Sequence, residues 1–541
     1  MSDLDVLIIG GYSPSDSSAG GSPTRDQIRL SYKNQFVTLE FIKHLVKSSG
    51  NLKLTEQLCM ASNQAKMVSR SLNTIYLYDF LTENGINAKA INYFLLEQDK
   101  FKKAIQQKPK VVVISTTFIY DPSEINLIAK SVKDFSPDSI IIAGGIKILK
   151  SFKKFNLFNE GYFTDFDINT MQKSNFFFDY EIDKFIDVFI IEENGELTLL
   201  EVVSKIKNGK DFKDTPNISY RDKQKLIFTN RKPEPFTFEK RLISWDKIPK
   251  DIIGNEIPVR TGLGCPFKCA FCDFTGLHKV RIRTIDHVIE ELRLIQKTFP
   301  GMPIFFTDDN LFTNKQRTKD LSEAIVKNNL KFKWRAFFRV DAISEDNVGI
   351  LAKSGCMVAY LGIESGDNTI LKNMNKRATR EQNLKTVQLL NGNGISTIST
   401  IIIGFPGETR DTVNNTINLL NSYPDIKLSI NKYYPFVFML FPLSPIASPE
   451  NRKKFDIKGG YENWGHCTMD SNQAKEEFLR CFKEVNIPSV AYLEFIDPEI
   501  PITKISDVSR ERDMLVKADI KNINDQNINV VFKKFKNIIY T

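Results

Sequence analysis

The sequence predicts an α/β protein that begins with a doubly wound, flavodoxin- or Rossmann-like parallel sheet. Over residues 1–207, short apolar runs such as Val111–Thr117 and Ile140–Gly145 alternate with helical stretches. This alternation is typical of a parallel sheet with helices on both faces. It resumes after residue 256, and residues 441–541 read as a small helix-rich segment. The expected division is 1–207, a linker at 208–255 with a short hairpin at 218–228, 256–440 and 441–541.

The first domain has five expected strands, each ending near glycine, hydroxyl or acidic residues. They cover Leu4–Ile9, Ala88–Tyr93, Val111–Thr117, Ile140–Gly145 and Phe185–Ile191, with helices at Ile75–Leu81 and Pro122–Phe135 and a third that follows Glu192–Glu196 and ends at Lys207. Ligands of doubly wound sheets bind outside the carboxyl ends of the strands. Ser115, Thr116, Gly144 and Gly145 are therefore candidate ligand contacts, although Gly144 and Gly145 alone would also suit an ordinary turn.

Composition excludes several classes of protein. The net charge of +9 is spread over 541 residues without a long run of like charges, so no nucleic-acid partner is expected. No apolar run approaches 18 residues and the N-terminus lacks a signal-peptide pattern, so no membrane partner is expected either. Seven cysteines, three of them within eight residues, do not form a disulfide framework. The expected location is the reducing cytoplasm.

Those three cysteines, Cys265, Cys269 and Cys272, follow a short apolar run at Ile257–Val259. Three thiolates on one loop can bind three irons of a cubane cluster and leave the fourth iron open, because four thiolates are the usual complement. The alternative is a structural zinc loop, which would need a fourth ligand such as His278 or Cys356.

Four stretches in this order resemble the radical S-adenosylmethionine (SAM) superfamily, over roughly residues 255–440. They are Gly264–Cys272, Phe305–Phe312, Leu361–Gly366 and Ile401–Thr409. The resemblance implies a partial (β/α)6 TIM-like barrel built on six expected strands: Ile257–Val259, Pro303–Phe306, Lys333–Arg339, Val358–Leu361, Thr397–Ile403 and Leu428–Tyr433. Barrel sites lie at the carboxyl ends of the strands.

The resemblance also implies the roles of individual residues. Cys265, Cys269 and Cys272 would hold a 4Fe–4S cluster whose open iron binds SAM. Phe271 matches the position that meets the adenine, Glu364 the strand-end motif beside SAM, and Gly404 the backbone stretch that passes the adenine.

Each of these three residues also has a simpler interpretation. Phe271 would only pack, Glu364 would pair with Arg339 or Arg377, and Gly404 would belong to a turn. The roles of two further pairs of residues stay open. Asp308 and Asp309 are adjacent on a strand and should point to opposite faces. His466, beside Trp464, either faces the substrate or packs as a structural residue.

A doubly wound domain ahead of this barrel resembles the cobalamin-binding domains of cobalamin-dependent radical SAM enzymes. By that resemblance Ser115, Thr116, Gly144 and Gly145 would contact cobalamin. The Asp-x-His-x-x-Gly motif that supplies a cobalt ligand in many cobalamin domains is missing, since His44 is the only histidine before residue 278. Bound cobalamin would therefore lack a histidine on its lower face.

The implied activity is methylation of an unactivated position in a small-molecule or peptide natural-product precursor, with flavodoxin or ferredoxin as reductant. A non-methylating rearrangement or cyclisation with the same cofactors is the alternative, and a zinc-stabilised binding module without catalysis is a third reading. A methylthiotransferase would need three more cysteines in the first domain, where Cys59 stands alone.

Overall fold

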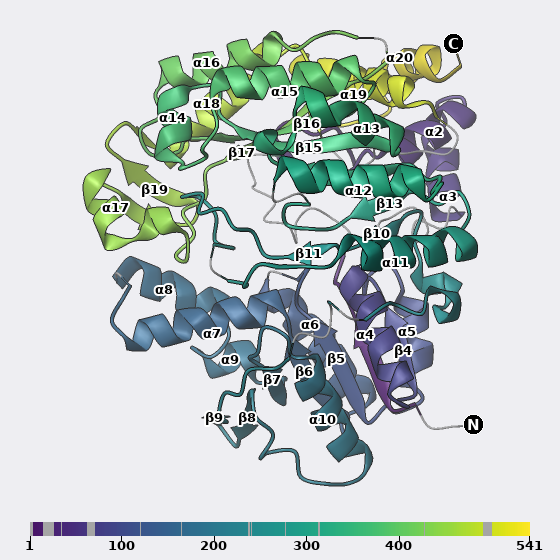
Figure 1. Ribbon diagram of the computed structural model, residues 1–541, viewed down its shortest axis with the longest axis vertical. Helices are drawn as coiled ribbons and strands as arrows, with labels where there is room; N and C mark the ends of the chain where they lie inside the picture. The colour runs from purple at the N-terminus through teal and green to yellow at the C-terminus, as the bar shows by residue number, and fades with distance from the viewer. Residues whose placement is uncertain are drawn as a thin grey trace. The chain divides into compact units, whose positions relative to one another are not determined.

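The computed structural model describes residues 4–13, 26–33, 35–61, 71–119, 121–163, 165–235, 239, 241–275, 277–311, 314–426, 428–490 and 500–540 (Figure 1). The expected loop at 14–23 and part of the expected helical stretch at 25–72 fall outside these ranges. The chain forms two compact units. The first contains Met1–Gly21, Ala65–Val259 and Arg281–Met302, and the second contains Ser22–Gln64, Arg260–Val280 and Pro303–Thr541.

The first unit is built on a seven-stranded sheet in the order β4-β1-β5-β6-β7-β8-β9. Its strands are β1 (Val6–Ile9), β4 (Ala88–Ile91), β5 (Val111–Ser115), β6 (Ile140–Gly144), β7 (Val188–Ile190), β8 (Ile218–Asp222) and β9 (Lys225–Phe228). The first five in the sheet run parallel, and in chain order they read 2-1-3-4-5, the flavodoxin-like arrangement. The predicted doubly wound sheet is confirmed. The hairpin expected in the linker is β8–β9, which extends this sheet in antiparallel fashion.

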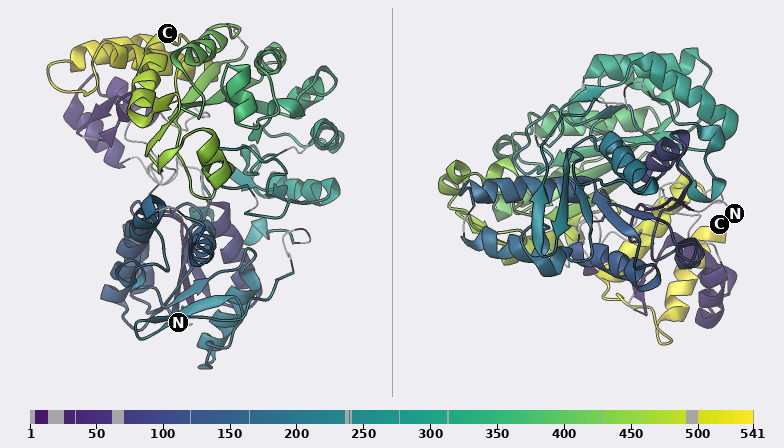
Figure 2. Two further views of the ribbon diagram at one scale, coloured as in Figure 1. Left: turned by 90° about the vertical axis from the view of Figure 1, so that its left-hand side faces the viewer. Right: turned by 90° about the horizontal axis from the view of Figure 1, so that it is seen from below.

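The helices of this unit lie against both faces of the sheet (Figures 1 and 2). They are α4 (Leu72–Glu83), α5 (Gln98–Ile105), α6 (Pro122–Phe135), α7 (Ile146–Asn159), α8 (Asp165–Ser174), α9 (Tyr180–Asp183) and α10 (Glu196–Lys207). The unit also contains α11 (Ile285–Thr298), which packs on a short 3₁₀ turn at Trp245–Lys247, and a second such turn at Lys250–Ile252. Helix α6 shows why such predictions succeed. Asp121 accepts a hydrogen bond from the Ser123 N–H, and Pro122 occupies the first turn, where no N–H is needed.

The second sheet has six strands in chain order: β10 (Ile257–Val259), β13 (Ile304–Phe306), β14 (Trp334–Phe338), β15 (Cys356–Glu364), β16 (Ser396–Ile403) and β17 (Asn431–Val437). Neighbouring strands from β13 to β17 are parallel. Between them run α12 (Lys315–Lys327), a 3₁₀ turn at Val340–Ala342, α13 (Glu345–Lys353), α14 (Asn368–Asn373), α15 (Arg380–Gly392) and α16 (Arg410–Asn421). Six strands in sequential order, parallel from β13 to β17, confirm the predicted partial barrel. The sixth begins three residues later than predicted.

The remaining elements include the helix-rich C-terminal segment, as predicted. They are β11 (Gly262–Leu263), β12 (Arg281–Ile282), a 3₁₀ turn at Pro445–Ala447, α17 (Pro449–Lys454), β18 (Lys458–Gly460), β19 (Asn463–His466), β20 (Met469–Asp470), α18 (Ser471–Glu484), α19 (Ile502–Lys517) and α20 (Ile528–Tyr540). No helix in the described part of the chain is both long and apolar enough to cross a lipid bilayer.

Residues 22–64 lie in the second unit, although the sequence led us to expect them as an extension of the first domain. They form β2 (Ser31–Tyr32), β3 (Gln35–Phe36), α2 (Leu39–Lys47) and α3 (Leu52–Ala61). Helix α2 packs on α20, so the purple N-terminal helices lie beside the yellow C-terminal ones in Figure 1. The cause is a shared apolar core, in which Leu45 of α2 is buried together with Val531 and Phe535 of α20.

Candidate cofactor-binding sites

Two aspartates accept hydrogen bonds from the start of the loop that carries the three cysteines. The Asp308 carboxylate accepts hydrogen bonds from the N–H of Thr261, at 2.9 and 3.1 Å, and from its hydroxyl, at 3.0 Å. Asp309 accepts the Gly264 N–H at 3.0 Å. Both residues lie beyond β13, which ends at Phe306, and not on the strand as expected. Asp308 is buried and Asp309 exposed, and burial raises the pKa of Asp308 to about 6. Both carboxylates therefore position the cysteine loop.

The cysteines themselves are held from the other side by the ends of β14 and α14. The Ala270 N–H donates to the carbonyl of Met374 at 2.8 Å, and the Asn375 amide donates to the carbonyl of Lys268 at 2.8 Å. Arg339 follows β14, and its Nη1 lies 3.7 Å from the Cys269 Sγ. Its guanidinium sits 3.7 Å from the centroid of the Phe267 ring, and its Nη2 donates to the Lys376 carbonyl at 2.6 Å.

The three thiols are close enough to influence one another. Burial raises the pKa of Cys265 and raises that of Cys272 to about 11, and Cys269 adds to both effects. Among the described residues, no three His, Cys, Asp or Glu side chains meet in an arrangement that would hold a metal ion as it stands. The assignment of these thiols as cluster ligands therefore stays a prediction. The donor set fits a cluster, because three thiols lie on one loop and an arginine lies against the middle thiol.

Cys356 does not belong to this loop. It begins β15, and its register partner Trp334 lies five residues before Arg339 along β14. Five residues of strand span roughly 16 Å, so Cys356 sits toward the opposite end of the sheet from the cysteine loop. Cys356 is also buried, and burial raises the pKa of its thiol. The zinc alternative with Cys356 as fourth ligand is wrong.

Phe271 and Glu364 are brought together by Lys376, which sequence reasoning missed. The Lys376 Nζ lies 2.9 Å from the Glu364 Oε1 and 5.8 Å from the centroid of the Phe271 ring. The other oxygen of Glu364 accepts the Thr400 hydroxyl at 3.1 Å. Glu364 has φ +65°, a strained conformation for a residue with a side chain, and such strain often marks functional sites. The partner of Glu364 is Lys376, not Arg339 or Arg377 as the simpler interpretation had it.

Gly404 occupies a position that only glycine fits. Its φ is +91°, and a Cβ there would lie 2.6 Å from the Ala474 Cβ and 2.8 Å from the Trp464 ring. Its N–H donates to Glu408, and its carbonyl lies 3.1 Å from the His466 Nε2. The His466 ring stacks on Trp464 with centroids 5.2 Å apart, so the structure gives His466 a packing role.

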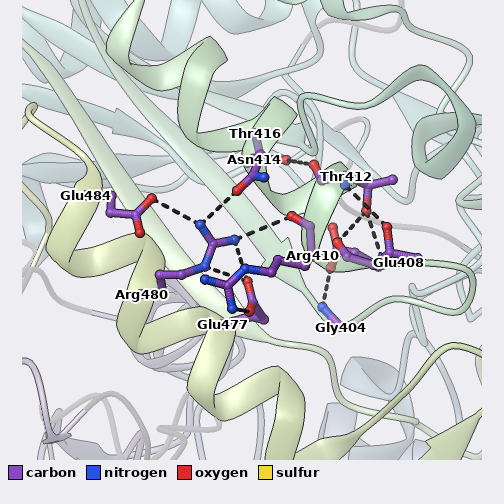
Figure 3. A network of polar contacts seen from close by, with 10 residues as sticks. Gly404, Glu408, Arg410, Thr412, Asn414, Thr416, Glu477, Arg480 and Glu484 are labelled. Atoms are coloured by element: carbon purple, nitrogen blue, oxygen red, sulfur yellow. Dashed lines mark hydrogen bonds and ion pairs between the residues drawn. The ribbon is translucent and has the colours of Figure 1, made fainter.

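Glu408 begins a polar network that joins this turn to α16 and α18. It is fully buried, and burial raises its pKa to about 8. Figure 3 shows Glu408 reaching back to Gly404 while Arg410 and Arg480 converge on Glu477. The backbone stretch that is expected to pass the adenine is thus held at Gly404 by the buried Glu408 carboxyl group.

The predicted ligand residues of the first unit also meet at one place. Ser115 pairs with Gly144 across β5 and β6, and Thr116 donates both its N–H (2.7 Å) and its hydroxyl (2.9 Å) to the Gly144 carbonyl. Gly145 has φ +110°, and a Cβ there would lie 3.1–3.2 Å from Thr116 and Thr117. Ser115 and Thr116 are buried, so this edge offers a ligand mainly the backbone of the two glycines.

Comparison with known proteins identifies the part of the chain that carries the cysteine loop. Residues 259–420 match the family model of the radical SAM superfamily. These residues form a radical SAM domain. An uncharacterised methyltransferase of Pyrococcus horikoshii is 32% identical over 237 residues, covering 42% of this chain and 51% of that protein. The anaerobic magnesium-protoporphyrin IX monomethyl ester cyclase of Rubrivivax gelatinosus is 24% identical over 382 residues, covering 67% of this chain and 64% of that protein.

These matches span between half and two thirds of the length of the two curated relatives. The fold as a whole is similar to that of TsrM from Kitasatospora setae, a radical SAM methyltransferase whose structure has cobalamin and a [4Fe-4S] cluster bound. The TM-score is 0.52 at 15% identity, and the alignment covers 82% of this chain and 77% of TsrM. The likeness therefore extends over the doubly wound sheet as well as the radical SAM domain, as a likeness of fold.

Proposed function

We propose that the protein is a cobalamin-dependent radical SAM methyltransferase that acts on an unactivated position of a small-molecule or peptide precursor in the cytoplasm. The observation that carries this proposal is a combination within one chain. A flavodoxin-like sheet is joined to a radical SAM domain whose three cysteines lie on one loop. The methyltransferase name of the Pyrococcus relative and the shared fold of TsrM support it.

In this proposal Cys265, Cys269 and Cys272 hold a 4Fe–4S cluster. When bound, the cluster supplies the electron that splits a C–S bond of SAM, and cobalamin carries the methyl group to the substrate. The protein positions these groups. Arg339 places a buried positive charge and a hydrogen-bond donor against the middle thiol.

The SAM contacts follow from the same geometry. Lys376 holds the Glu364 carboxylate at the carboxyl end of β15, close to the Phe271 ring. Gly404 presents a turn whose N–H and carbonyl are already bonded to side chains, so its shape is fixed before SAM arrives. In the first unit, Gly144 and Gly145 offer backbone to the corrinoid beside Ser115 and Thr116. No histidine occurs from residue 65 to 259, so the strand ends of this sheet would offer a corrinoid no imidazole.

A second candidate is a cyclisation or rearrangement without methyl transfer, using the same cofactors. It is favoured by the protoporphyrin ester cyclase match, which covers 67% of this chain. The two functions differ in where the methyl group of SAM goes. A flavodoxin- or ferredoxin-type reductant would serve either one.

The test uses full-length protein purified without oxygen, with its cluster reconstituted and hydroxocobalamin supplied. Iron and corrinoid are measured after desalting for the wild type, for a variant with Cys265, Cys269 and Cys272 all replaced by alanine, and for Cys356→Ala as matched control. About four irons in the wild type and the control, and none in the triple variant, are expected. Equal iron in all three proteins, or none in the wild type, would contradict the cluster assignment.

The two candidate reactions are separated with SAM that carries a deuterated methyl group. Deuterium in the corrinoid fraction is the expected result and indicates methyl transfer. Formation of 5′-deoxyadenosine with no deuterium in the corrinoid would favour cyclisation or rearrangement. A protein that retains iron but no corrinoid would remain a radical SAM enzyme whose first sheet binds another ligand.

A further inference from the structure

One face of the second sheet carries a cluster of aromatic rings that the cofactors do not account for. Side chains alternate along a strand, and on β14 the buried Trp334, Ala336 and Phe338 point to one face while Arg335 and Phe337 point to the other. The register places Phe305 beside Arg335 and Tyr360 beside Phe337. We call Phe305, Arg335, Phe337 and Tyr360 the aromatic face.

The rings of the aromatic face are held in fixed positions. The centroids of Phe337 and Tyr360 are 4.8 Å apart, and that of Phe305 lies 5.8 Å from Phe337 and 6.2 Å from Tyr360. Arg335 is buried, its guanidinium lies 3.8 Å from the Phe305 centroid, and it donates to the Tyr360 hydroxyl. Arg335 thereby contacts two of the three rings. The third, Phe337, is 39% exposed, which is unusual for a large apolar side chain in a central strand.

A polar side chain without partners lies at the carboxyl end of this face. Asn310 is 7% exposed, and neither its Oδ1 nor its Nδ2 has a hydrogen-bond partner in the described part of the chain. The next residue, Leu311, donates its N–H to the carbonyl of Phe337 at 3.2 Å, so Asn310 lies close to the end of β14. Buried amides in folded proteins are almost always paired. A buried amide with both groups unpaired, whose chain neighbour bonds the backbone of Phe337, points to a ligand that pairs with it.

We propose that the aromatic face and Asn310 bind the substrate, and that the substrate carries a planar aromatic heterocycle with an N–H donor and a carbonyl acceptor side by side, as in a lactam. The rings supply offset or edge-to-face contacts. The asparagine amide offers one acceptor and two donors, so it pairs with such an edge through two hydrogen bonds. Apolar walls with a few polar groups are typical of small-molecule sites.

The position of the face agrees with the proposed function, on which this inference rests. Tyr360 and Glu364 lie on the same strand, four residues apart, so the face begins roughly 13 Å below the residue expected to contact SAM. Phe337 pairs with Tyr360 and lies at the same level, two residues (roughly 7 Å) before Arg339, which contacts Cys269. A ring stacked on Phe337 with its edge toward Asn310 would lie against the sheet, below the residues that anchor the cysteine loop.

The probe is 2-quinolinone, a flat bicyclic lactam, titrated into full-length reconstituted protein and followed by saturation-transfer NMR. δ-Valerolactam has the same donor–acceptor edge without an aromatic ring, and indole has the ring with a donor only. The variants are Asn310→Leu and Phe337→Leu. Phe135→Leu, at a 53% exposed phenylalanine of α6 in the first unit, is the matched control. A thermal melt of each variant checks folding, and Phe337→Leu keeps the test meaningful should Asn310→Leu fold poorly.

We expect saturable binding of 2-quinolinone to the wild type and the control, and weaker binding of indole and δ-valerolactam. Loss of two hydrogen bonds should weaken 2-quinolinone binding about tenfold or more in Asn310→Leu. Loss of ring stacking should weaken it roughly two- to tenfold in Phe337→Leu. Equal affinity in all four proteins would overturn the proposal, as would no saturable binding to wild type that retains its iron. The iron and corrinoid measurements on the same preparation show separately whether the proposed function has failed.

Discussion

Replacing Arg339 by methionine tests whether the cysteine loop is held in place by the rest of the second unit. Methionine keeps much of the apolar stem of arginine but removes the charge and the donors. In the wild type the guanidinium covers the Phe267 ring, lies against the Cys269 thiol and donates to the Lys376 carbonyl. The variant should therefore be less stable and should retain less iron.

The size of the effect follows from the burial of each contact. A cation over a desolvated ring contributes about 1–2 kcal/mol, and losing a charged donor to a buried carbonyl costs about 1.5–3 kcal/mol. The ion pair with Asp341, whose side chain is 39% exposed, adds about 1 kcal/mol or less. Because the terms share one side chain and are not additive, we expect the free energy of unfolding to fall by about 3–5 kcal/mol.

The assay is guanidinium-induced unfolding of anaerobic apo-protein, followed by iron content after reconstitution. Arg410→Met is the matched control, because the Arg410 side chain is 71% exposed and its ion pair with Glu477 should contribute below about 1 kcal/mol. Should Arg339→Met unfold within about 1 kcal/mol of the wild type and retain the same iron, Arg339 would not be holding the loop.

Two further predictions concern the turn at Gly404. Gly404→Ala should lower the free energy of unfolding by about 2–4 kcal/mol, because φ is +91° and the added Cβ would clash with Ala474. The matched control is Gly392→Ala, since Gly392 ends α15 with open space around it. This change should raise the free energy of unfolding by about 0.5–1 kcal/mol. Equal effects of the two substitutions would refute the reasoning. Glu408 has a pKa raised to about 8 in the folded protein, so the stability it contributes is present below its unfolded pKa of 4.5 and is lost as pH rises toward 8. Glu408→Gln should remove this decline, whose slope is at most about 1.4 kcal/mol per pH unit, and parallel stability–pH curves for variant and wild type would contradict it.

The strands and helices were predictable wherever the local pattern and the tertiary fold agree. The predicted helix at Pro122–Phe135 matches the structure residue for residue, because it starts with an Asp cap and a proline suited to a helix N-terminus, and the next predicted helix ends at Lys207 as expected. The hairpin at 218–228 was foreseen as a hairpin, but its pairing with β7 was not, since nothing in its sequence shows which edge it joins. Strand pairing between distant segments depends on the whole sheet.

The residues of the candidate site also fall into two groups, those that a sequence motif predicts and those whose role depends on the fold. The cysteines, Phe271, Glu364 and Gly404 stand in recognisable motifs, and the structure brings Phe271 and Glu364 together at Lys376. Lys376 lies twelve residues beyond Glu364 with no motif of its own, and only the turn after α14 returns it to the carboxylate. The anchoring by Asp308 and Asp309 was hidden for a similar reason. Two adjacent acids predict opposite orientations but give no hint that both accept N–H groups of the same loop.

The largest difference from the sequence-based division concerns where the chain's segments belong, and it has consequences for experiments. The second unit takes residues 22–64 from between β1 and β4 of the doubly wound sheet, and the first takes Arg281–Met302 from after the cysteines. A fragment that begins at the linker would lack α2, whose Leu45 is buried in the same apolar core as Val531 and Phe535 of α20. A fragment that ends at the linker would lack α11, whose Glu291 accepts the indole N–H of Trp245 at 2.9 Å and the guanidinium of Arg283. Each cut would expose buried apolar or charged groups, so cofactor loading and substrate binding need to be measured on the whole chain.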